Sequence, residues 1–186
     1  MRVIAGSARR QLLKTPDGLK TRPTQDRIKE TLFNIIQNEV PGSLFCDFCC
    51  GGGGIGIEAL SRGAVRAYFI ENDKDALSCL VDNIKKTHFE DTAVVLRTDA
   101  AAALSRIHEK HLDIVYIDPP YDSPLAAQIV QALYDMPYID ENTLIIVETS
   151  LTSDFSFLED AGFVLEREKR YKTQRHLFIR KESQNQ

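Results

Sequence analysis

The sequence lacks several features that would decide its class at once. It has no apolar run near the roughly 20 residues that a membrane-spanning helix needs, since its longest runs, such as Leu144 to Val147, are the length of strands. Its N-terminus has no apolar core followed by a cleavage site, which argues against a secretory signal. It shows no internal repeat and no low-complexity segment. For a chain of 186 residues, these absences favour one ordinary globular domain in the cytoplasm.

Cysteine is scarce and unevenly placed. Three of the four cysteines, Cys46, Cys49 and Cys50, fall in one short segment, and the fourth is Cys79. A structural zinc site needs four ligands, usually as two separated pairs, and only Cys79 and scattered histidines remain to complete one here. A thioredoxin-type redox pair is disfavoured because the glycine run that follows has a better explanation. We therefore predict no metal site and no disulfides, and interpret these cysteines as small buried residues at the end of a strand.

Positive charge is in deficit overall. The formal net charge is −4 and the sequence pI is about 5.6, so composition alone does not indicate a nucleic-acid partner. The distribution is uneven, however: residues 1–30 hold eight basic and three acidic residues, a charge of +5, which leaves −9 for the remainder. Basic residues return at Arg167, Lys169, Arg170, Lys172, Arg175, Arg180 and Lys181. The two ends could form a positive surface that meets phosphates, or they could be ordinary solvated faces.

The order of expected elements indicates an α/β fold. A short hairpin is expected over residues 2–14, and a helix over residues 24–38 with Thr24 as its cap. Strands at 44–48, 65–70, 94–97, 112–117 and 143–147 then alternate with helices around 58–60 and at 73–86, 100–108 and 123–135. Such alternation predicts a parallel sheet with helices on both faces.

The end of the chain departs from this alternation. After a short expected helix at 155–161, two strands at 163–170 and 175–180 follow with no helix between them, which predicts an antiparallel strand at one edge. We divide the chain into an N-terminal hairpin and helix extension, residues 1–40, and a main domain, residues 41–186.

A glycine-rich loop follows the first expected strand. Gly51, Gly53 and Gly56 fit the G-x-G-x-x-G fingerprint, in which glycines let the backbone turn sharply and approach a ligand, and the next helix offers free N–H groups. Glu71 ends the second strand 20 residues after Gly51, where a carboxylate can accept the hydroxyls of a ribose. Together they predict an adenosine-containing cofactor across the first two strand ends. They do not choose between NAD and S-adenosylmethionine.

The tetrapeptide Asp118-Pro119-Pro120-Tyr121 follows the fourth expected strand. It resembles the (Asn/Asp/Ser)-Pro-Pro-(Tyr/Phe) active site of amino-methyltransferases. An exocyclic amine conjugated with its ring is a poor nucleophile, but the Asp118 carboxylate and the Pro119 carbonyl can accept its two N–H groups and hold its lone pair toward a sulfonium methyl. Tyr121 can stack on the base, which must first leave its own stack. Since ligands bind at the carboxyl ends of such strands, this reading is favoured over a rigid turn, and S-adenosylmethionine over NAD.

Asp99 comes directly after the third expected strand. In methyltransferases of this class an acid there commonly accepts a hydrogen bond from the adenine amino group. The same residue could cap the helix that begins at Ala100. The two roles are compatible, and the cofactor role is favoured.

Over nearly its whole length the chain resembles the bacterial 16S ribosomal RNA guanine-N2 methyltransferases. The resemblance rests on the segments 2–6, 22–34 and 58–64 and on the tetrapeptide at 118–121. It implies a class I methyltransferase (Rossmann-like) fold with a seven-stranded sheet, mostly parallel with one antiparallel strand, plus the N-terminal extension. The family usually carries a small hydroxyl residue where this chain has Gly52.

The resemblance also implies roles for individual residues. The expected S-adenosylmethionine site is lined by Asp47, Gly51, Gly53, Glu71 and Asp99. The residues expected to hold the base are Asp118, Pro119 and Tyr121. Contacts to RNA are expected from Arg9 and Arg10 in the hairpin and from Arg22, although Arg22 read alone could equally be a phosphate contact or a surface residue. The expected partner is ribosomal RNA or the small ribosomal subunit, bound by a monomer.

The predicted activity is methyl transfer from S-adenosylmethionine to the exocyclic N2 amine of a guanine in small-subunit (16S) ribosomal RNA. The same chemistry on another RNA or DNA base is the nearest alternative. An NAD-dependent oxidoreductase is more remote, because Asp-Pro-Pro-Tyr would have no role in it. A non-catalytic RNA-binding module on a degenerate fold is a third alternative.

Overall fold

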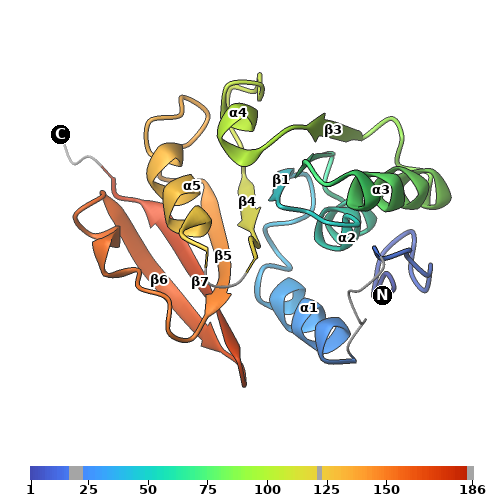
Figure 1. Ribbon diagram of the computed structural model, residues 1–186, viewed down its shortest axis with the longest axis horizontal. Helices are drawn as coiled ribbons and strands as arrows, with labels where there is room; N and C mark the ends of the chain where they lie inside the picture. Colours follow the sequence, from blue (N-terminus) through green and yellow to red (C-terminus); the bar gives the residue numbers. More distant parts are fainter. Residues whose placement is uncertain (17–22, 121–122, 184–186) are drawn as a thin grey trace.

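The computed structural model describes residues 1–16, 23–120 and 123–183. These residues form a seven-stranded sheet in the order β3-β2-β1-β4-β5-β7-β6 (Figure 1). The strands are β1 (Leu44–Phe48), β2 (Arg66–Glu71), β3 (Ala93–Arg97), β4 (Ile114–Ile117), β5 (Leu144–Ser150), β6 (Phe163–Arg170) and β7 (Gln174–Lys181). The predicted α/β sheet, mostly parallel with one antiparallel strand, is thus confirmed.

The helices are α1 (Pro23–Ile35), α2 (Gly54–Ser61), α3 (Lys74–Thr87), α4 (Ala100–Leu104), α5 (Leu125–Leu133) and the short 3₁₀ helix η1 (Ser156–Leu158). Four are shorter than the sequence predicted. The helix expected over 24–38 begins one residue earlier, at Pro23, and ends at Ile35, and the one expected over 123–135 spans Leu125–Leu133. The helix expected over 100–108 ends at Leu104, and the one expected over 155–161 is a single 3₁₀ turn. None of the described helices is long and apolar enough to cross a membrane.

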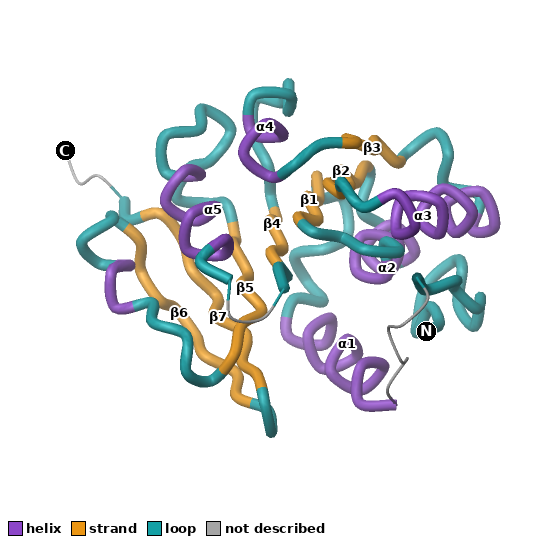
Figure 2. Tube along the Cα trace, in the orientation of Figure 1, coloured by secondary structure: helices purple, strands orange, loops and turns teal. Residues whose placement is uncertain are grey.

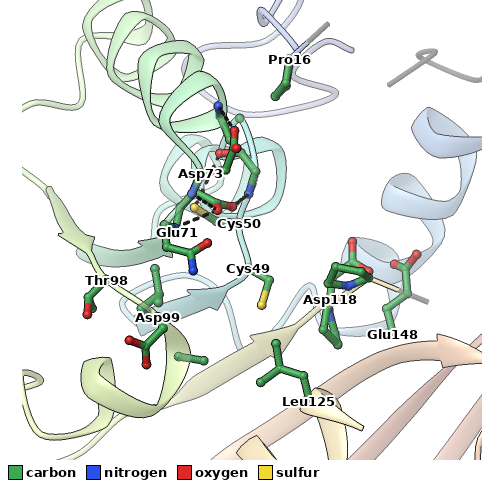
Figure 3. A pocket seen from close by; sticks show the side chains of 18 of the residues that line it. Pro16, Cys49, Cys50, Glu71, Asp73, Thr98, Asp99, Asp118, Leu125 and Glu148 are labelled. Atoms are coloured by element: carbon green, nitrogen blue, oxygen red, sulfur yellow. Dashed lines mark hydrogen bonds between the residues drawn. The ribbon is translucent and has the colours of Figure 1, made fainter. Parts of the chain in front are cut away.

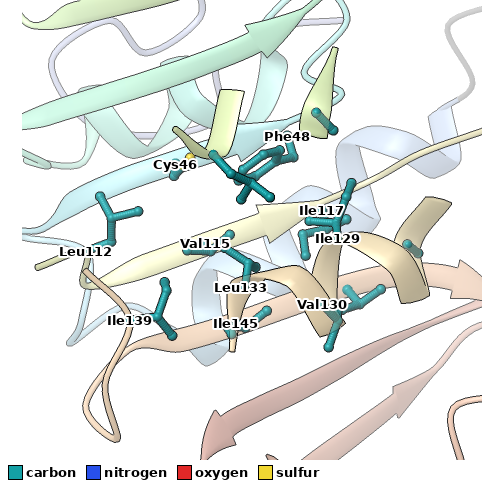
Figure 4. Close-up of a cluster of buried hydrophobic side chains, with 14 of the residues drawn as sticks. Cys46, Phe48, Leu112, Val115, Ile117, Ile129, Val130, Leu133, Ile139 and Ile145 are labelled. Carbon is teal, nitrogen blue, oxygen red and sulfur yellow. The ribbon is translucent and has the colours of Figure 1, made fainter. Parts of the chain in front are cut away.

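Alternate residues of β4 point to opposite faces of the sheet, as the period of a strand requires. Ile114 and Tyr116 pack in a cluster with α1, α2 and α3, whereas Val115 and Ile117 pack in a second cluster with α4 and α5. Figure 4 shows Val115 and Ile117 against α5. β4 is therefore apolar throughout because both of its faces are covered, which is typical of a central parallel strand.

The antiparallel strand lies one place in from the edge. β7 pairs with β5 on one side and β6 on the other, so β6 and not β7 ends the sheet. The reason is apolar content: Leu177, Phe178 and Ile179 of β7 are buried in both clusters, whereas most side chains of β6 are exposed. The antiparallel strand was therefore predicted correctly, but its position was wrong by one strand: it is second from the edge and not at the edge.

The N-terminal segment, residues 1–16, is a compact loop beside α2 (Figure 2) rather than a regular hairpin. The expected pairing is reduced to one antiparallel bridge, between Arg2 and Leu12. Backbone hydrogen bonds run from Val3 N to Gln11 O, from Leu13 N to Met1 O and from Arg10 N to Val3 O, each at 2.9 Å. Val3, Ala8 and Leu13 from this segment are buried in the same cluster as Phe33 of α1. Residues 1–16 and α1 therefore share the core of the main domain.

A buried carboxylate joins the N-terminal segment to two helices. Glu58 of α2 has no solvent exposure and accepts hydrogen bonds from the backbone N–H groups of Ile4 (2.8 Å) and Ala5 (3.0 Å). It also accepts from Arg62 Nε at 2.8 Å and lies 3.3 Å from Lys29 Nζ of α1. Burial lowers the pKa of Lys29 although Glu58 acts to raise it, so this ion pair carries a real desolvation cost.

We expect Glu58→Ala to lower the free energy of unfolding by about 3 kcal/mol or more, because it leaves the buried Lys29 ammonium without its counter-ion and the partly buried N–H groups of Ile4 and Ala5 without their acceptor. Urea denaturation followed by circular dichroism measures the change. Glu90→Ala, at an exposed glutamate, is the matched control and should change stability by less than about 0.5 kcal/mol. Equal stability of the two variants would contradict this role of Glu58.

Candidate active site

A cavity of about 800 Å³ opens at the carboxyl ends of the parallel strands. Its walls come from the segments that follow β1 (49–52), β2 (72–73), β3 (98–101) and β4 (118–120), together with Glu148 of β5. Thr15 and Pro16 of the N-terminal segment also line it. In Figure 3, Glu71 and Asp99 lie on one side and Asp118 and Glu148 on the other. The structure therefore brings into one cavity residues that are far apart in the sequence, such as Glu71 and Glu148, which are 77 positions apart.

The glycine loop is shaped by packing as much as by any ligand. Gly53 has φ +80°, and a Cβ there would lie 2.4 Å from Leu80 Cδ1. Asp47 is buried and its carboxylate accepts a hydrogen bond from Gly56 N at 2.8 Å, which joins the end of β1 to the first turn of α2. Gly51 lines the cavity, whereas Asp47 and Gly53 stand behind its wall. Direct contact of these last two with a cofactor stays a prediction.

Glu71 joins the end of β2 to this loop. Its Oε2 accepts from Gly51 N at 2.9 Å, and its Oε1 accepts from Asn72 N at 2.8 Å and Asp73 N at 2.9 Å. A carboxylate has about four acceptor positions, so these backbone bonds are compatible with a ligand hydroxyl as a further donor. Glu71 and Gly51 thus meet at the cavity, as the 20-residue spacing predicted.

Asp99 lies on the cavity wall and also caps α4. Its Oδ1 accepts from Ala102 N at 2.9 Å, and its backbone is extended, as an N-cap requires. The capping alternative raised by the sequence is therefore observed. The contact with an adenine amino group stays a prediction.

Asp118 and Pro119 form the opposite wall. The Asp118 backbone N–H donates to Phe48 O at 3.3 Å, which fixes the start of the tetrapeptide against β1. Loss of water around the carboxyl, together with the negative charges of Glu148 and Asp47, raises the pKa of Asp118 well above its usual value. Asp118 is therefore a stronger base than a solvated aspartate. Tyr121, the last residue of the predicted base site, lies outside the described residues.

The two cysteines at the loop are not nucleophiles. Cys49 and Cys50 both line the cavity and are partly buried, rather than fully buried as the sequence suggested. Burial raises the pKa of the Cys49 thiol to about 12, with Glu71 and Asp118 adding to the effect. The thiol therefore stays protonated and acts as a small apolar lining group. Among the described residues, no group of three or more His, Cys, Asp and Glu could hold a metal ion.

The N-terminal segment is fastened to the glycine loop by Asn83 of α3. Asn83 Oδ1 accepts from Lys14 N at 2.7 Å, and its Nδ2 donates to Lys14 O at 2.9 Å and to Gly52 O at 2.8 Å. A Cβ on Gly52 would lie 2.9 Å from Lys14 O, so the close approach of this segment explains glycine at a position where the family usually has a hydroxyl residue. We call this set of bonds the Asn83 clamp.

Of the predicted RNA-contacting arginines, Arg9 and Arg10 do not line the cavity. Arg9 and Arg10 are exposed and follow Ala8, whose N–H donates to Ser61 Oγ at the far end of α2. Arg22 lies outside the described residues. The role of all three stays a prediction.

Sequence reasoning missed Glu148. It is the acid that ends the apolar run Leu144 to Val147 in β5, and it lines the cavity beside Asp118. A carboxylate at the carboxyl end of a buried strand was the available signal. Thr15 and Pro16 were also missed, and no local pattern could have placed them there.

The order of the strands, the inserted antiparallel β7 and a cavity at the carboxyl ends of β1 and β4 are those of a class I methyltransferase, and the protein is an enzyme of that class. The chain belongs to the family described as "Conserved hypothetical protein 95", whose model matches residues 1–180. The predicted family resemblance is thereby confirmed.

Individual relatives agree. The chain is 35% identical over 151 residues to "Ribosomal RNA small subunit methyltransferase D" of Haemophilus influenzae, which covers 80% of this chain and 78% of that protein. It is 33% identical over 169 residues to the protein of the same name from Escherichia coli K12, covering 91% and 84%. Among solved structures, the yhhF protein of Escherichia coli superimposes with a TM-score of 0.81 at 31% identity and covers 99% of both chains.

The buried Asp47 makes stability depend on pH. Burial raises its pKa from 3.8 to about 7, with a smaller contribution from the charge of Glu71. Between pH 3.8 and about pH 7, Asp47 keeps its proton in the native state and loses it in the unfolded chain, so the free energy of unfolding falls as pH rises. Asp47→Asn keeps an oxygen for Gly56 N but cannot titrate, and should reduce the loss of stability between pH 5 and pH 8 by on the order of 1–3 kcal/mol.

Urea denaturation of the ligand-free protein at both pH values measures this difference. Asp91→Asn, at an exposed aspartate, should leave the pH dependence of the wild-type protein unchanged. An identical loss of stability in Asp47→Asn and wild type would mean that Asp47 is ionised in the native state.

Proposed function

We propose that this protein transfers a methyl group from S-adenosylmethionine to the N2 amine of a guanine in small-subunit (16S) ribosomal RNA. The observation that carries the proposal is the placement of Asp118 and Pro119 in one cavity with Gly51, Glu71 and Asp99. The first pair suits an exocyclic amine, and the second set suits an adenosine. The names of the relatives from Haemophilus influenzae and Escherichia coli support ribosomal RNA as the substrate.

The chemistry of the cavity fits S-adenosylmethionine better than NAD. No lysine or arginine is among the described residues that line it, whereas Glu71, Asp73, Asp99, Asp118 and Glu148 are. Such a lining attracts a positively charged sulfonium and repels a pyrophosphate. The start of α2, where a pyrophosphate would bind, is covered, since a Cβ on Gly54 would lie 2.1 Å from Met1 Sδ. The oxidoreductase alternative therefore has no support.

S-adenosylmethionine supplies, when bound, an electrophilic methyl group on a positively charged sulfur. Glu71 would accept the ribose hydroxyls, and Asp99 the adenine amino group. Asp118 and the Pro119 carbonyl would accept the two N–H groups of the target amine and so direct its lone pair into the cavity. As the nitrogen becomes positive, the carboxylates of Asp118 and Glu148 would stabilise that charge, and Asp118, with its raised pKa, is suited to take the released proton.

Contact with RNA is proposed for the N-terminal segment. Arg9 and Arg10 are exposed there. The Asn83 clamp and Glu58 hold this segment against the loop that borders the cavity. Phosphate contacts at this surface would orient the RNA while the base enters the cavity.

The test is incubation with methyl-labelled S-adenosylmethionine and small ribosomal subunits from a strain that lacks its own N2-methylguanine enzymes, followed by digestion and identification of the labelled nucleoside. Label in N2-methylguanosine supports the reaction, base and substrate together. Label in another nucleoside keeps the chemistry and discards guanine N2. If no label appears and calorimetry detects no S-adenosylmethionine binding, the proposal fails.

In the same assay, Asp118→Ala should lower the rate of transfer at least about 100-fold, because positioning and charge stabilisation of the amine are both lost. Calorimetry should show S-adenosylmethionine affinity within about threefold of wild type, because Asp118 lies on the wall opposite Glu71 and Asp99. Asp73→Ala changes an acid on the cofactor side of the cavity and is the comparison variant. It should lower the affinity for S-adenosylmethionine more than it lowers the rate of transfer at saturating S-adenosylmethionine. A folded Asp118→Ala protein that no longer binds the cofactor would contradict the role assigned to Asp118.

A further inference from the structure

Glu148 is an acid that the mechanism above uses only for its charge. It lies at the carboxyl end of β5, its side chain is 12% exposed, and it lines the cavity next to Asp118 (Figure 3). The negative charge of Glu148 is the largest cause, after burial, of the raised pKa of Asp118. The cavity therefore presents two carboxylates side by side on the wall that would receive the base.

The surroundings of Glu148 hold its carboxylate as a hydrogen-bond acceptor. Tyr116 OH and Gln174 Nε2 donate to it, and His176 Nε2 lies 2.9 Å from its Oε2. His176 is fully buried, and its other ring nitrogen lies 3.3 Å from Tyr171 OH. A carboxylate oxygen accepts, so each of these three neighbours must present a hydrogen toward Glu148.

Rigid strands carry this arrangement. Glu148 and His176 are directly opposite in the antiparallel pair of β5 and β7, and Tyr116 comes from the neighbouring β4. Sites built on strands with such supporting hydrogen bonds hold their geometry better than sites on loops. Glu148 is thus a fixed acceptor and can discriminate between ligands that differ in one hydrogen.

Guanine and adenine differ in that way beside their exocyclic amines. In guanine the N2 amine is next to N1–H, a donor, whereas in adenine the N6 amine is next to N1, an acceptor with no hydrogen. We propose that Glu148 accepts the N1–H of the target guanine while Asp118 and Pro119 hold its N2 amine, so that Glu148 makes the site specific for guanine. Adenine would place the N1 lone pair against the carboxylate and be repelled. This inference rests on the proposed function.

The experiment uses the nucleotide that the labelling assay identifies. Small subunits are assembled with RNA that carries either guanine or 2-aminopurine at that one position. 2-Aminopurine keeps the 2-amino group and lacks the N1 hydrogen. Transfer by wild type should favour guanine by roughly 10- to 100-fold in kcat/KM, the usual discrimination of a well-placed pair of base contacts. In Glu148→Gln the preference should fall to within about threefold, because an amide can turn either a donor or an acceptor toward N1.

Glu166→Gln is the matched control, since it makes the same change at an exposed carboxylate of β6. It should keep the wild-type preference for guanine. A purely structural role of Glu148 would lower transfer to both bases equally, and the ratio would not move. If Glu148→Gln transfers to neither base, binding replaces transfer as the measurement. The dissociation constants of the guanine and 2-aminopurine RNAs are then compared with S-adenosylhomocysteine present, and the preference for guanine should again be lost in Glu148→Gln.

Two results overturn the role of Glu148 while leaving the proposed function intact. One is a wild-type protein that methylates 2-aminopurine as well as guanine, and the other is an unchanged preference in Glu148→Gln. A wild-type protein that methylates no guanine at all refutes the proposed function first, and the role of Glu148 with it.

Discussion

The site depends on the parallel pairing of β1 with β4. From β1 the chain goes to β2 and β3 by way of α2 and α3 on one face, whereas α4 and α5, on either side of β4 in the chain, cover the other face. The segments that leave β1 and β4 therefore diverge, and the crevice between them is where ligands bind in open α/β sheets. The glycine loop and the Asp-Pro-Pro segment occupy its two sides because they follow these two strands.

Carboxylates have two roles in this acidic chain, one structural and one in lining the cavity. Asp47, Glu58 and Glu71 accept backbone N–H groups from segments distant in the sequence, and so join α2, the N-terminal segment and the glycine loop to the sheet. Asp118 and Glu148 face the cavity, and Glu71 has both roles, since it lines the cavity as well. The excess of negative charge, because of which composition alone did not indicate a nucleic-acid partner, is thus partly used inside the molecule.

The sequence predicted what depends on neighbouring residues and missed what depends on pairing between distant ones. Gly51, Glu71, Asp99 and Asp118 could be placed because each ends an apolar strand or follows one within three residues, and parallel strands end at one edge. The position of β7 could not, because it depends on Leu177 to Ile179 being better buried than the residues of β6. Glu148 acquires its donors only because β4 and β7 lie on either side of β5. The expected hairpin is reduced to one bridge, and Glu58 and Asn83 accept the neighbouring backbone N–H groups of Ile4, Ala5 and Lys14.

The Asn83 clamp has a thermodynamic consequence. One amide side chain bonds both Lys14 of the N-terminal segment and Gly52 of the cavity wall, and Thr15 and Pro16 beyond Lys14 line the cavity themselves. A ligand in the cavity and a macromolecule on the outer surface of residues 1–16 therefore act on the same set of bonds. If the ligand in the cavity changes the affinity for the macromolecule by some factor, the macromolecule changes the affinity for that ligand by the same factor. Under the proposed function, a cofactor in the cavity and RNA on the outer surface of residues 1–16 would be linked ligands of one protein.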